Sequence, residues 1–522
     1  MPEGQSKTDE ILNKVMDHVE SWGETAINSI STSNQMIAFH LCCLTEERIR
    51  TYNLVGIAQN ISQLHMKVRE DLFTLEWSLR CLQKLPDETN TSELEIRKKW
   101  NDKVAEQCMN NLEEFSKYYM LRDLVICTKR RGYSVSCPDH NTIEFVDAPN
   151  WQGHKDQKSR YISQLIEEDN SFRERVTRIN DFSLEGTLLD EKFPHDLDTS
   201  EFSSNEFWKV WNYLSNLCAR SIANHYKPRK KGRHYQTSHT KMLTIIKSKK
   251  ALVSEIYQRT GIGKSVVSRV ISWLSFNTNT PRKFSLFHCP IIEINNKSYL
   301  ILPHAVVFAS PSTVFLRLLA HYDKRAYDSA SSRLEKNKLN KIKSHLISGD
   351  RPIKTGIKLD LDGRDVELDL AEYDKNSSIL SIVQAKFFIP PDTVSEVDSA
   401  NEVILEAVEQ LKINKKLAES NEKLDVLFQK IGISSNKNIE IKYFLLPTGF
   451  TGSDYLDIPD WIHVIPAEFC LLSKYKGQSL VSIWQEYKKI WNSLDESAKS
   501  SYVERNSFNL AGWKFVAPTF RM

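Results

Sequence analysis

Three acids and a glutamine–lysine pair lie on two neighbouring segments that are both predicted to be strands. In the first segment Asp365, Glu367 and Asp369 alternate with apolar residues, and in the second Gln384 and Lys386 are two positions apart. Because successive side chains of a strand point to opposite faces, the three acids share one face of the first strand, and Gln384 and Lys386 share one face of the second. A polar stretch between the segments predicts a turn that joins them as a hairpin. Pairing would bring carboxylate, amide and lysine groups to one sheet surface.

Such a surface could hold a divalent cation and hydrolyse a phosphodiester. Hard oxygen ligands bind Mg²⁺ or Mn²⁺, and an ion of this kind with a nearby ammonium can activate water and stabilise charge on the phosphate. Lys386 lies near the end of the apolar segment 379–388. This segment predicts a central strand, where a charged side chain is costly without a role or a partner. The structural alternative is that acids simply alternate along a half-solvated strand. A neutral Gln384 would also hold a metal less tightly than an acid.

These residues resemble the PD-(D/E)XK nuclease superfamily, which has the restriction-endonuclease-like fold, in the variant with a Gln-x-Lys motif. The resemblance implies that Asp369 is the principal metal ligand and that Gln384 offers its side-chain oxygen. The Ala385 carbonyl is a further ligand by the same resemblance, and Lys386 would lie near the attacking water. In the superfamily the first core helix often supplies an acid to the metal, and Glu335 is the candidate here.

The elements around the motif follow the order that the resemblance implies. Helices are predicted over 331–348 and 395–420, before and after the hairpin, and a strand over 439–447. The order helix, three strands, helix, strand resembles the superfamily core and covers about 331–470. A strand over 461–472 and a helix over 482–494 are expected to complete this core. Three polar residues of the second helix are candidates to face the site: Glu406, Glu409 and Gln410.

A basic segment with interleaved aromatic residues begins at Lys227, and no acid occurs up to Lys250. Its cations suit a phosphate backbone, although a flexible solvated linker has a similar composition. The candidate DNA-binding residues in this segment are Arg229, Lys230, Lys231 and Arg233.

A helix-turn-helix pattern follows the basic segment. The helix 251–259 is predicted to bury Leu252, Ile256 and Tyr257, and a glycine-containing turn at 260–263 leads to the helix 264–276. A predicted hairpin over 284–302 resembles the wing of a winged helix. The second helix is predicted to bury Val267, Val270, Ile271 and Leu274 and to expose Lys264, Ser265 and Arg269 for contact with DNA. Packing against protein is the alternative role of such a module.

Length and composition agree with a soluble protein of several domains. The 522 residues allow two to four domains at roughly 100–200 residues each, and the formal net charge is +3. No apolar run approaches the roughly 20 residues of a membrane span, and the first residues lack the apolar stretch of a signal peptide. The nine cysteines form no Cys-x-x-Cys pair, which favours a cytoplasmic protein without a zinc site.

We therefore expect a multidomain α + α/β protein with three parts. They are a mainly helical N-terminal region (1–226), a basic segment with a winged-helix-like module (227–310) and a restriction-endonuclease-like domain (311–522). The expected function is a Mg²⁺- or Mn²⁺-dependent DNA endonuclease of restriction or anti-phage defence. Two alternatives remain, a catalytically weak DNA-binding regulator or adaptor and an RNA nuclease. The expected partner is DNA, without a membrane, and the N-terminal helices could join a second copy or an accessory protein.

Overall fold

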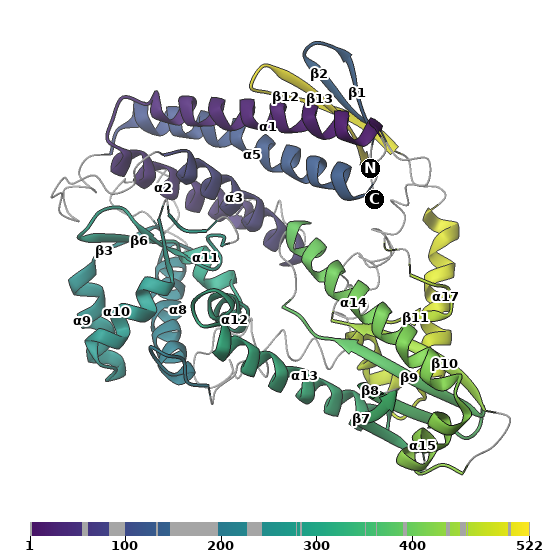
Figure 1. Cartoon of the computed structure of the whole chain (residues 1–522). Coiled ribbons are helices and arrows are strands. Elements are labelled where there is room, and N and C mark those ends of the chain that lie inside the picture. The colour runs from purple at the N-terminus through teal and green to yellow at the C-terminus, as the bar shows by residue number, and fades with distance from the viewer. Residues whose placement is uncertain are drawn as a thin grey trace. The chain divides into compact units, whose positions relative to one another are not determined.

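The computed structural model describes residues 3–54, 61–82, 100–131, 134–146, 197–226, 243–277, 279–281, 284–349, 351–361, 363–389, 394–434, 439–448, 456, 458–498 and 503–520. In these ranges the protein is a mixed α/β chain of helices and three small sheets (Figure 1). The chain divides into two compact units. Unit 1 combines Met1–Asp147, Asp190–Tyr327 and Arg505–Ala517, and unit 2 combines Ala148–Leu189, Asp328–Glu504 and Pro518–Met522. The three-part division expected from the sequence stays a prediction.

Four long helices pack against one another at the start of unit 1. They are α1 (Glu3–Asn28), α2 (Asn34–Leu54), α3 (Ile61–Cys81) and α5 (Asp102–Arg131). Trp77 of α3 stacks on Tyr118 of α5, with ring centroids 3.8 Å apart. Gly23 of α1 allows this packing, because a Cβ atom there would lie 2.6 Å from the Trp77 ring. The helical character predicted for this region is confirmed in the described residues.

A small sheet in unit 1 joins segments from both halves of the sequence. Its strands are β1 (Ser134–Asp139), β2 (Thr142–Val146), β12 (Val503–Leu510) and β13 (Trp513–Phe520), in the order β1-β2-β13-β12. The strand β13 runs parallel to β2. The turn between β12 and β13 has positive φ at Ala511 and Gly512, as expected for a tight hairpin turn.

The remainder of unit 1 is built around a second small sheet in the order β3-β6-β5-β4. Its strands are β3 (Ile245–Ser248), β4 (Ser275–Phe276), β5 (Ile291–Glu293) and β6 (Ser298–Ile301). Its helices are α8 (Ser204–Tyr226), α9 (Lys249–Thr260), α10 (Lys264–Trp273), α11 (Pro303–Phe308) and α12 (Pro311–Tyr322). Gly261 ends α9 with a φ of 73°, a conformation that glycine adopts without steric cost.

Three details of this region differ from the expectation. The helix α10 ends at Trp273 and not at residue 276, because Ser275 and Phe276 pair with β5 as the strand β4. Tyr257 is 44% exposed, whereas Leu252 and Ile256 are buried. The two aliphatic residues are four positions apart and share a helix face, and Tyr257 lies about 100° further round. The hairpin begins at Ile291 and not at residue 284, because residues 285–289 form a turn in which the Ser285 carbonyl accepts the N–H groups of His288 and Cys289. The expected burial of Val267, Val270, Ile271 and Leu274 is confirmed.

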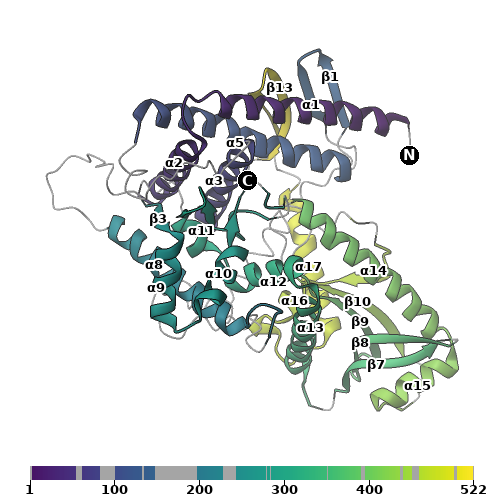
Figure 2. The ribbon, with the colours of Figure 1, turned by 60° about the vertical axis from the view of Figure 1, so that its left-hand side comes forward.

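Unit 2 is a sheet covered by helices on both faces (Figure 2). The described strands are β7 (Ile353–Leu361), β8 (Arg364–Asp374), β9 (Ile379–Lys386), β10 (Glu440–Pro447) and β11 (Ile462–Val464), in the order β11-β10-β9-β8-β7. The pairs β7–β8 and β8–β9 are antiparallel, and β9–β10 and β10–β11 are parallel. The strand β9 is buried up to Ala385, as its apolar sequence predicts for a central strand.

The two faces of this sheet are covered by different helices. One face packs on α14 (Val394–Ala418) and α15 (Asn421–Ile431). The other packs on α13 (Lys324–Leu346), α16 (Ala467–Cys470) and α17 (Leu480–Ala498). A long strand over 461–472 was expected, and this prediction is wrong. The strand ends at Val464 and Pro466 caps the start of α16, because proline lacks the N–H that a sheet ladder needs.

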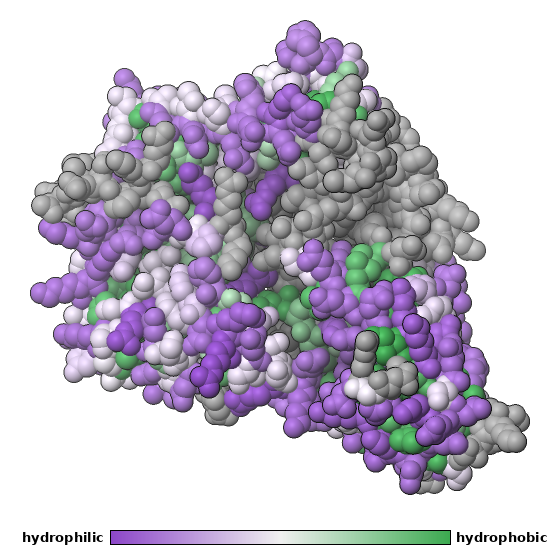
Figure 3. All heavy atoms as spheres, in the orientation of Figure 1, coloured by the Kyte–Doolittle hydropathy of each residue, from purple (hydrophilic) through white to green (hydrophobic). Residues whose placement is uncertain are grey.

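In the described ranges, no helix combines the length and the apolar character needed to cross a membrane. On the face drawn in Figure 3, hydrophilic residues predominate and apolar residues form small patches among them.

Candidate functional site

The strands β8 and β9 part in the middle of the unit 2 sheet. They pair from Asp374↔Ile379 to Leu370↔Val383. Beyond this point the described pairing of β9 continues with β10 as far as Lys386, and that of β8 continues with β7. Where the ladder ends, the Ala385 N–H donates a hydrogen bond to Asp369 Oδ2 (2.7 Å). The Asp369 side chain therefore takes the place of a backbone acceptor at the point where the strands separate.

The side of the sheet to which the apolar side chains of β8 point also changes here. Leu368 packs on the α14 and α15 side of the sheet, whereas Leu370, two residues later, packs on the α13 and α17 side. The paired positions of β7 and β8 skip Gly356 and Asp369, and Gly356 has a φ of 63°. A left-handed glycine interrupts the regular pleat. The sequence pattern predicted that Leu368 and Leu370 would face the same side of the sheet. This prediction is wrong, because the alternation of side chains is interrupted at Asp369.

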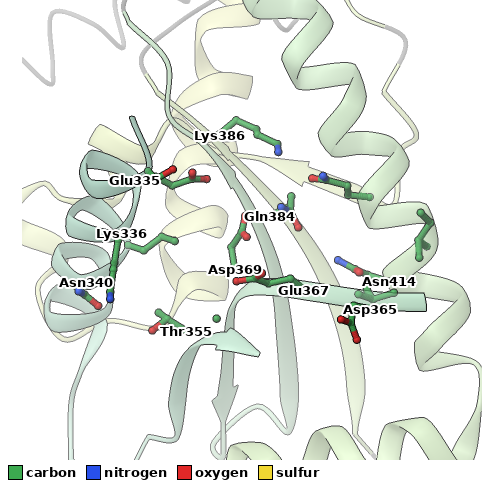
Figure 4. Close-up of a pocket in the computed structure, with 16 residues that line it drawn as sticks. Glu335, Lys336, Asn340, Thr355, Asp365, Glu367, Asp369, Gln384, Lys386 and Asn414 are labelled. Carbon is green, nitrogen blue, oxygen red and sulfur yellow. The ribbon is translucent and has the colours of Figure 1, made fainter. Parts of the chain in front are cut away.

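A pocket of about 700 Å³ lies at the parting of the two strands. It is lined from α13, β7, β8, β9 and α14, and Figure 4 shows its side chains. The acids Asp365, Glu367 and Asp369 line it. Glu335 of α13 and the Gln384 and Lys386 pair of β9, which were proposed from two separate segments of the sequence, line it as well. Of the three candidates on α14, Gln410 lines the pocket, while Glu409 is exposed and forms an ion pair with Lys412 (2.7 Å).

The Asp369 carboxyl is the most strongly perturbed group of the pocket. Burial raises its pKa to about 7, and the nearby carboxylates of Glu335 and Glu367 act in the same direction. The hydrogen bond from Ala385 and the ammonium of Lys386 oppose this rise without cancelling it. Burial likewise raises the pKa of Glu335. Four acidic side chains and two lysines line the pocket, so acidic groups outnumber basic ones.

Gln384 has an unusual environment for a buried amide. Its side chain is 4% exposed, and Oε1 has no hydrogen-bond partner among the described residues. Buried polar atoms normally have a partner, so an unpaired carbonyl oxygen calls for an explanation. The backbone beyond it is held firmly, since the Lys386 carbonyl accepts hydrogen bonds from Thr448 N–H (2.8 Å) and Thr448 Oγ1 (3.2 Å). The oxygen is therefore presented from a fixed strand end.

The donor set fits a hard divalent cation. Among the described residues, no three His, Cys, Asp or Glu side chains form a group that could hold a metal by themselves. A cation in this pocket would therefore need an amide or backbone oxygen as well. Asp369, Gln384 and Glu335 offer carboxylate and amide oxygens, and Mg²⁺ is commonly bound by one or two carboxylates, with waters and substrate phosphates completing its shell.

Asn414 of α14 is a pocket residue that the sequence analysis missed. It lines the pocket, is 1% exposed, and within the described ranges neither amide atom has a hydrogen-bond partner. Its signal in the sequence is a polar residue three positions from both Leu411 and Leu417, which are buried on the apolar side of the helix. Residues at this spacing share a helix face.

The proposed DNA-binding residues fall into two groups. Arg229, Lys230, Lys231 and Arg233 lie outside the described residues. Lys264, Ser265 and Arg269 are exposed on α10, as expected. The Lys264 ammonium lies 5.3 Å from the Tyr257 ring centroid, and Arg269 donates to the Glu201 carbonyl (3.2 Å).

Two lysines at the described end of the basic segment form ion pairs with acids outside the segment. Lys247 forms an ion pair with Glu255 (2.7 Å). Lys249 forms an ion pair with Glu293 and lies 5.0 Å from the ring centroid of Tyr299. Because these partners come from other elements, a segment without acids of its own is partly neutralised by the fold.

No family model, no curated protein and no solved structure matches this chain.

Proposed function

We propose that the protein is a metal-dependent nuclease that hydrolyses phosphodiester bonds in DNA at the unit 2 pocket. The observation that carries this proposal is the unpaired, buried Oε1 of Gln384, which lines the same pocket as the buried carboxyl of Asp369. An amide oxygen without a partner and a carboxyl with a raised pKa are both costly in a folded protein. A cation bound by both oxygens would remove both unfavourable contributions to the free energy of the folded protein.

Each residue has a defined part in this proposal. Asp369 and Gln384 hold the ion, and Glu335 contributes a further carboxylate. When bound, Mg²⁺ or Mn²⁺ supplies Lewis-acid activation of the phosphate and of a nucleophilic water. Lys386 offsets part of the carboxylate charge, since its ammonium interacts with both Asp369 and Glu335. Near the reacting phosphate it would stabilise the negative charge that develops.

The architecture of unit 2 supports the same proposal. The order α13, β7, β8, β9, α14, α15, β10, with an antiparallel hairpin beside a parallel pair, supports a PD-(D/E)XK-like core of the Gln-x-Lys variant in which α15 is an additional helix before β10. The candidate ligands Asp369 and Gln384 lie on β8 and β9, the second and third strands of that order, and this placement supports the proposal.

Unit 1 supports DNA as the substrate. The order α8, β3, α9, α10, β4, β5, β6, with β3 paired to β6, supports a winged-helix-like module, and α10 presents exposed Lys264 and Arg269. A nuclease centre combined with a DNA-reading module is typical of restriction and anti-phage defence proteins, and this biological role is an analogy from architecture.

A cleavage assay with matched lysine variants tests the proposal. The protein is incubated with Mg²⁺ or Mn²⁺ and either plasmid DNA, single-stranded DNA or RNA, alongside Lys386→Ala and Lys354→Ala. Lys354 is an exposed lysine of β7 that does not line the pocket. We expect metal-dependent cleavage of duplex DNA, a loss of about 100-fold or more in Lys386→Ala, and no loss in Lys354→Ala.

The other outcomes of this assay are also informative. Cleavage of RNA alone would identify an RNA nuclease. DNA binding without any cleavage would identify an adaptor. Equal rates for Lys386→Ala and the wild type would show that the pocket is not the centre of the reaction.

A further inference from the structure

A glutamine ligand raises a problem that a carboxylate ligand does not. The two oxygens of a carboxylate are equivalent, whereas an amide ends in one acceptor oxygen and one donor nitrogen of nearly the same shape. Only the oxygen can bind a cation. The pocket must therefore contain a group that selects the amide orientation in which Gln384 Oε1 faces the metal position.

Asn414 carries the group with the required chemistry. In Figure 4 the oxygen of the Gln384 amide is directed toward the side of the pocket where the nitrogen of the Asn414 amide lies. Both residues are buried and line the pocket, and among the described residues neither Gln384 Oε1 nor Asn414 Nδ2 has a hydrogen-bond partner. One atom is an acceptor and the other is a donor, so each is the partner that the other lacks.

The helix holds Asn414 in this position at an energetic cost. Leu411 and Leu417, three positions before and after it, are fully buried against the sheet, which keeps the Asn414 side chain from turning to solvent. A buried amide with both ends unpaired is destabilising. A leucine would fill an apolar helix face without that cost, which points to a function for the amide.

We infer that Asn414 is a positioning residue for metal binding, an inference that rests on the proposed nuclease function. Its Nδ2–H donates to one lone pair of Gln384 Oε1 and so directs the oxygen, with its second lone pair free, toward the cation. The two side chains line the same pocket from β9 and from α14. Groups that orient a metal ligand in this way typically change metal affinity by 10- to 100-fold.

Calorimetric titration with Mn²⁺ tests this role in the full-length protein. Asn414→Ala should lower Mn²⁺ affinity by about 10-fold or more, and Asn414→Leu should do the same. In a Gln384→Leu background, Asn414→Ala should cause no further loss, because the ligand through which it acts is absent. The control is Asn401→Ala on the same helix. Asn401 also has a buried amide oxygen without a partner among the described residues, but it does not line the pocket, and its replacement should leave Mn²⁺ affinity unchanged.

The outcomes separate this inference from the function on which it rests. If the wild type binds Mn²⁺ and Asn414→Ala binds it equally well, the positioning role is wrong and the nuclease proposal stands. The role would also be overturned if Asn414→Ala lowered Mn²⁺ affinity equally in the wild-type and Gln384→Leu backgrounds. The same holds if Asn401→Ala lowered Mn²⁺ affinity as much as Asn414→Ala. If the wild type itself binds no Mn²⁺, the proposed function and the positioning role are both wrong.

Discussion

Replacing Asp369 by asparagine should stabilise the metal-free protein while removing its activity. The asparagine Oδ1 can still accept the hydrogen bond from the Ala385 N–H, so the strand junction is kept. What is removed is a carboxyl whose ionised form is disfavoured by burial and by the neighbouring acids. We therefore expect a gain in stability at alkaline pH and a loss of metal binding.

The size and sign of this effect follow from the pKa of Asp369. In the folded protein it is about 7, against an ordinary value of 3.8. Between these values the folded chain binds more protons than the unfolded chain, so the free energy of unfolding of the wild type falls as pH rises. One pKa unit corresponds to about 1.4 kcal/mol, so the stability difference between Asp369→Asn and the wild type should grow by about 3 kcal/mol from pH 5 to pH 8.

Urea unfolding in the presence of a chelator measures this difference. Both proteins are unfolded at pH 5 and at pH 8, and Asp365→Asn is the control because Asp365 is exposed on the same strand. We expect the advantage of Asp369→Asn to appear mainly at pH 8 and the control to follow the wild type. An advantage of the same size at both pH values would refute the argument that a buried, ionising carboxyl is responsible.

Two further predictions concern the ligand set and the DNA-binding face. Gln384→Glu should keep or strengthen Mn²⁺ binding because an anionic oxygen replaces a neutral one, and Gln384→Leu should weaken it. Calorimetry measures the affinities, and equal values for the wild type and both variants would show that Gln384 is not a ligand. Replacing Lys264 and Arg269 together by alanine should weaken DNA binding and reduce its salt dependence, by roughly 0.9 in log affinity against log salt for each phosphate that is no longer bound. Fluorescence anisotropy at two salt concentrations measures this, and unchanged affinity would make the module a protein-packing element.

Local patterns predicted most of unit 2. The apolar run of β9 indicated a central strand, and the polar turn at 374–378 indicated its pairing with β8, because both features depend only on adjacent residues. The same holds for α10, whose apolar residues at helical spacing are all buried. The predicted hairpin already indicated that Asp369 and Gln384 would lie close together, whereas the presence of Glu335 in the same pocket could be expected only through the superfamily resemblance, since Glu335 comes from a separate helix.

The features that the sequence analysis missed depend on tertiary context. Nothing near Lys247 indicates that Glu255 will neutralise it, because that contact forms only when α9 packs beside β3. The change of facing at Asp369 had one local signal, the glycine at 356 inside a strand pattern, which is typical of an irregular pleat. Asn414 had a weaker signal, a single polar residue on an apolar helix face.

The small sheet that joins β2 to β13 has a consequence for the order in which the chain is made. Lys514 pairs with Thr142, so the two strands are about 370 residues apart in the sequence. At the roughly 5–20 residues per second of protein synthesis, β2 waits about 20 to 75 seconds for its partner. During this time its edge is open to pairing with another nascent chain. The five strands of the unit 2 sheet, from β7 to β11, are synthesised within that interval, so this sheet can form before the last strands of unit 1 are made.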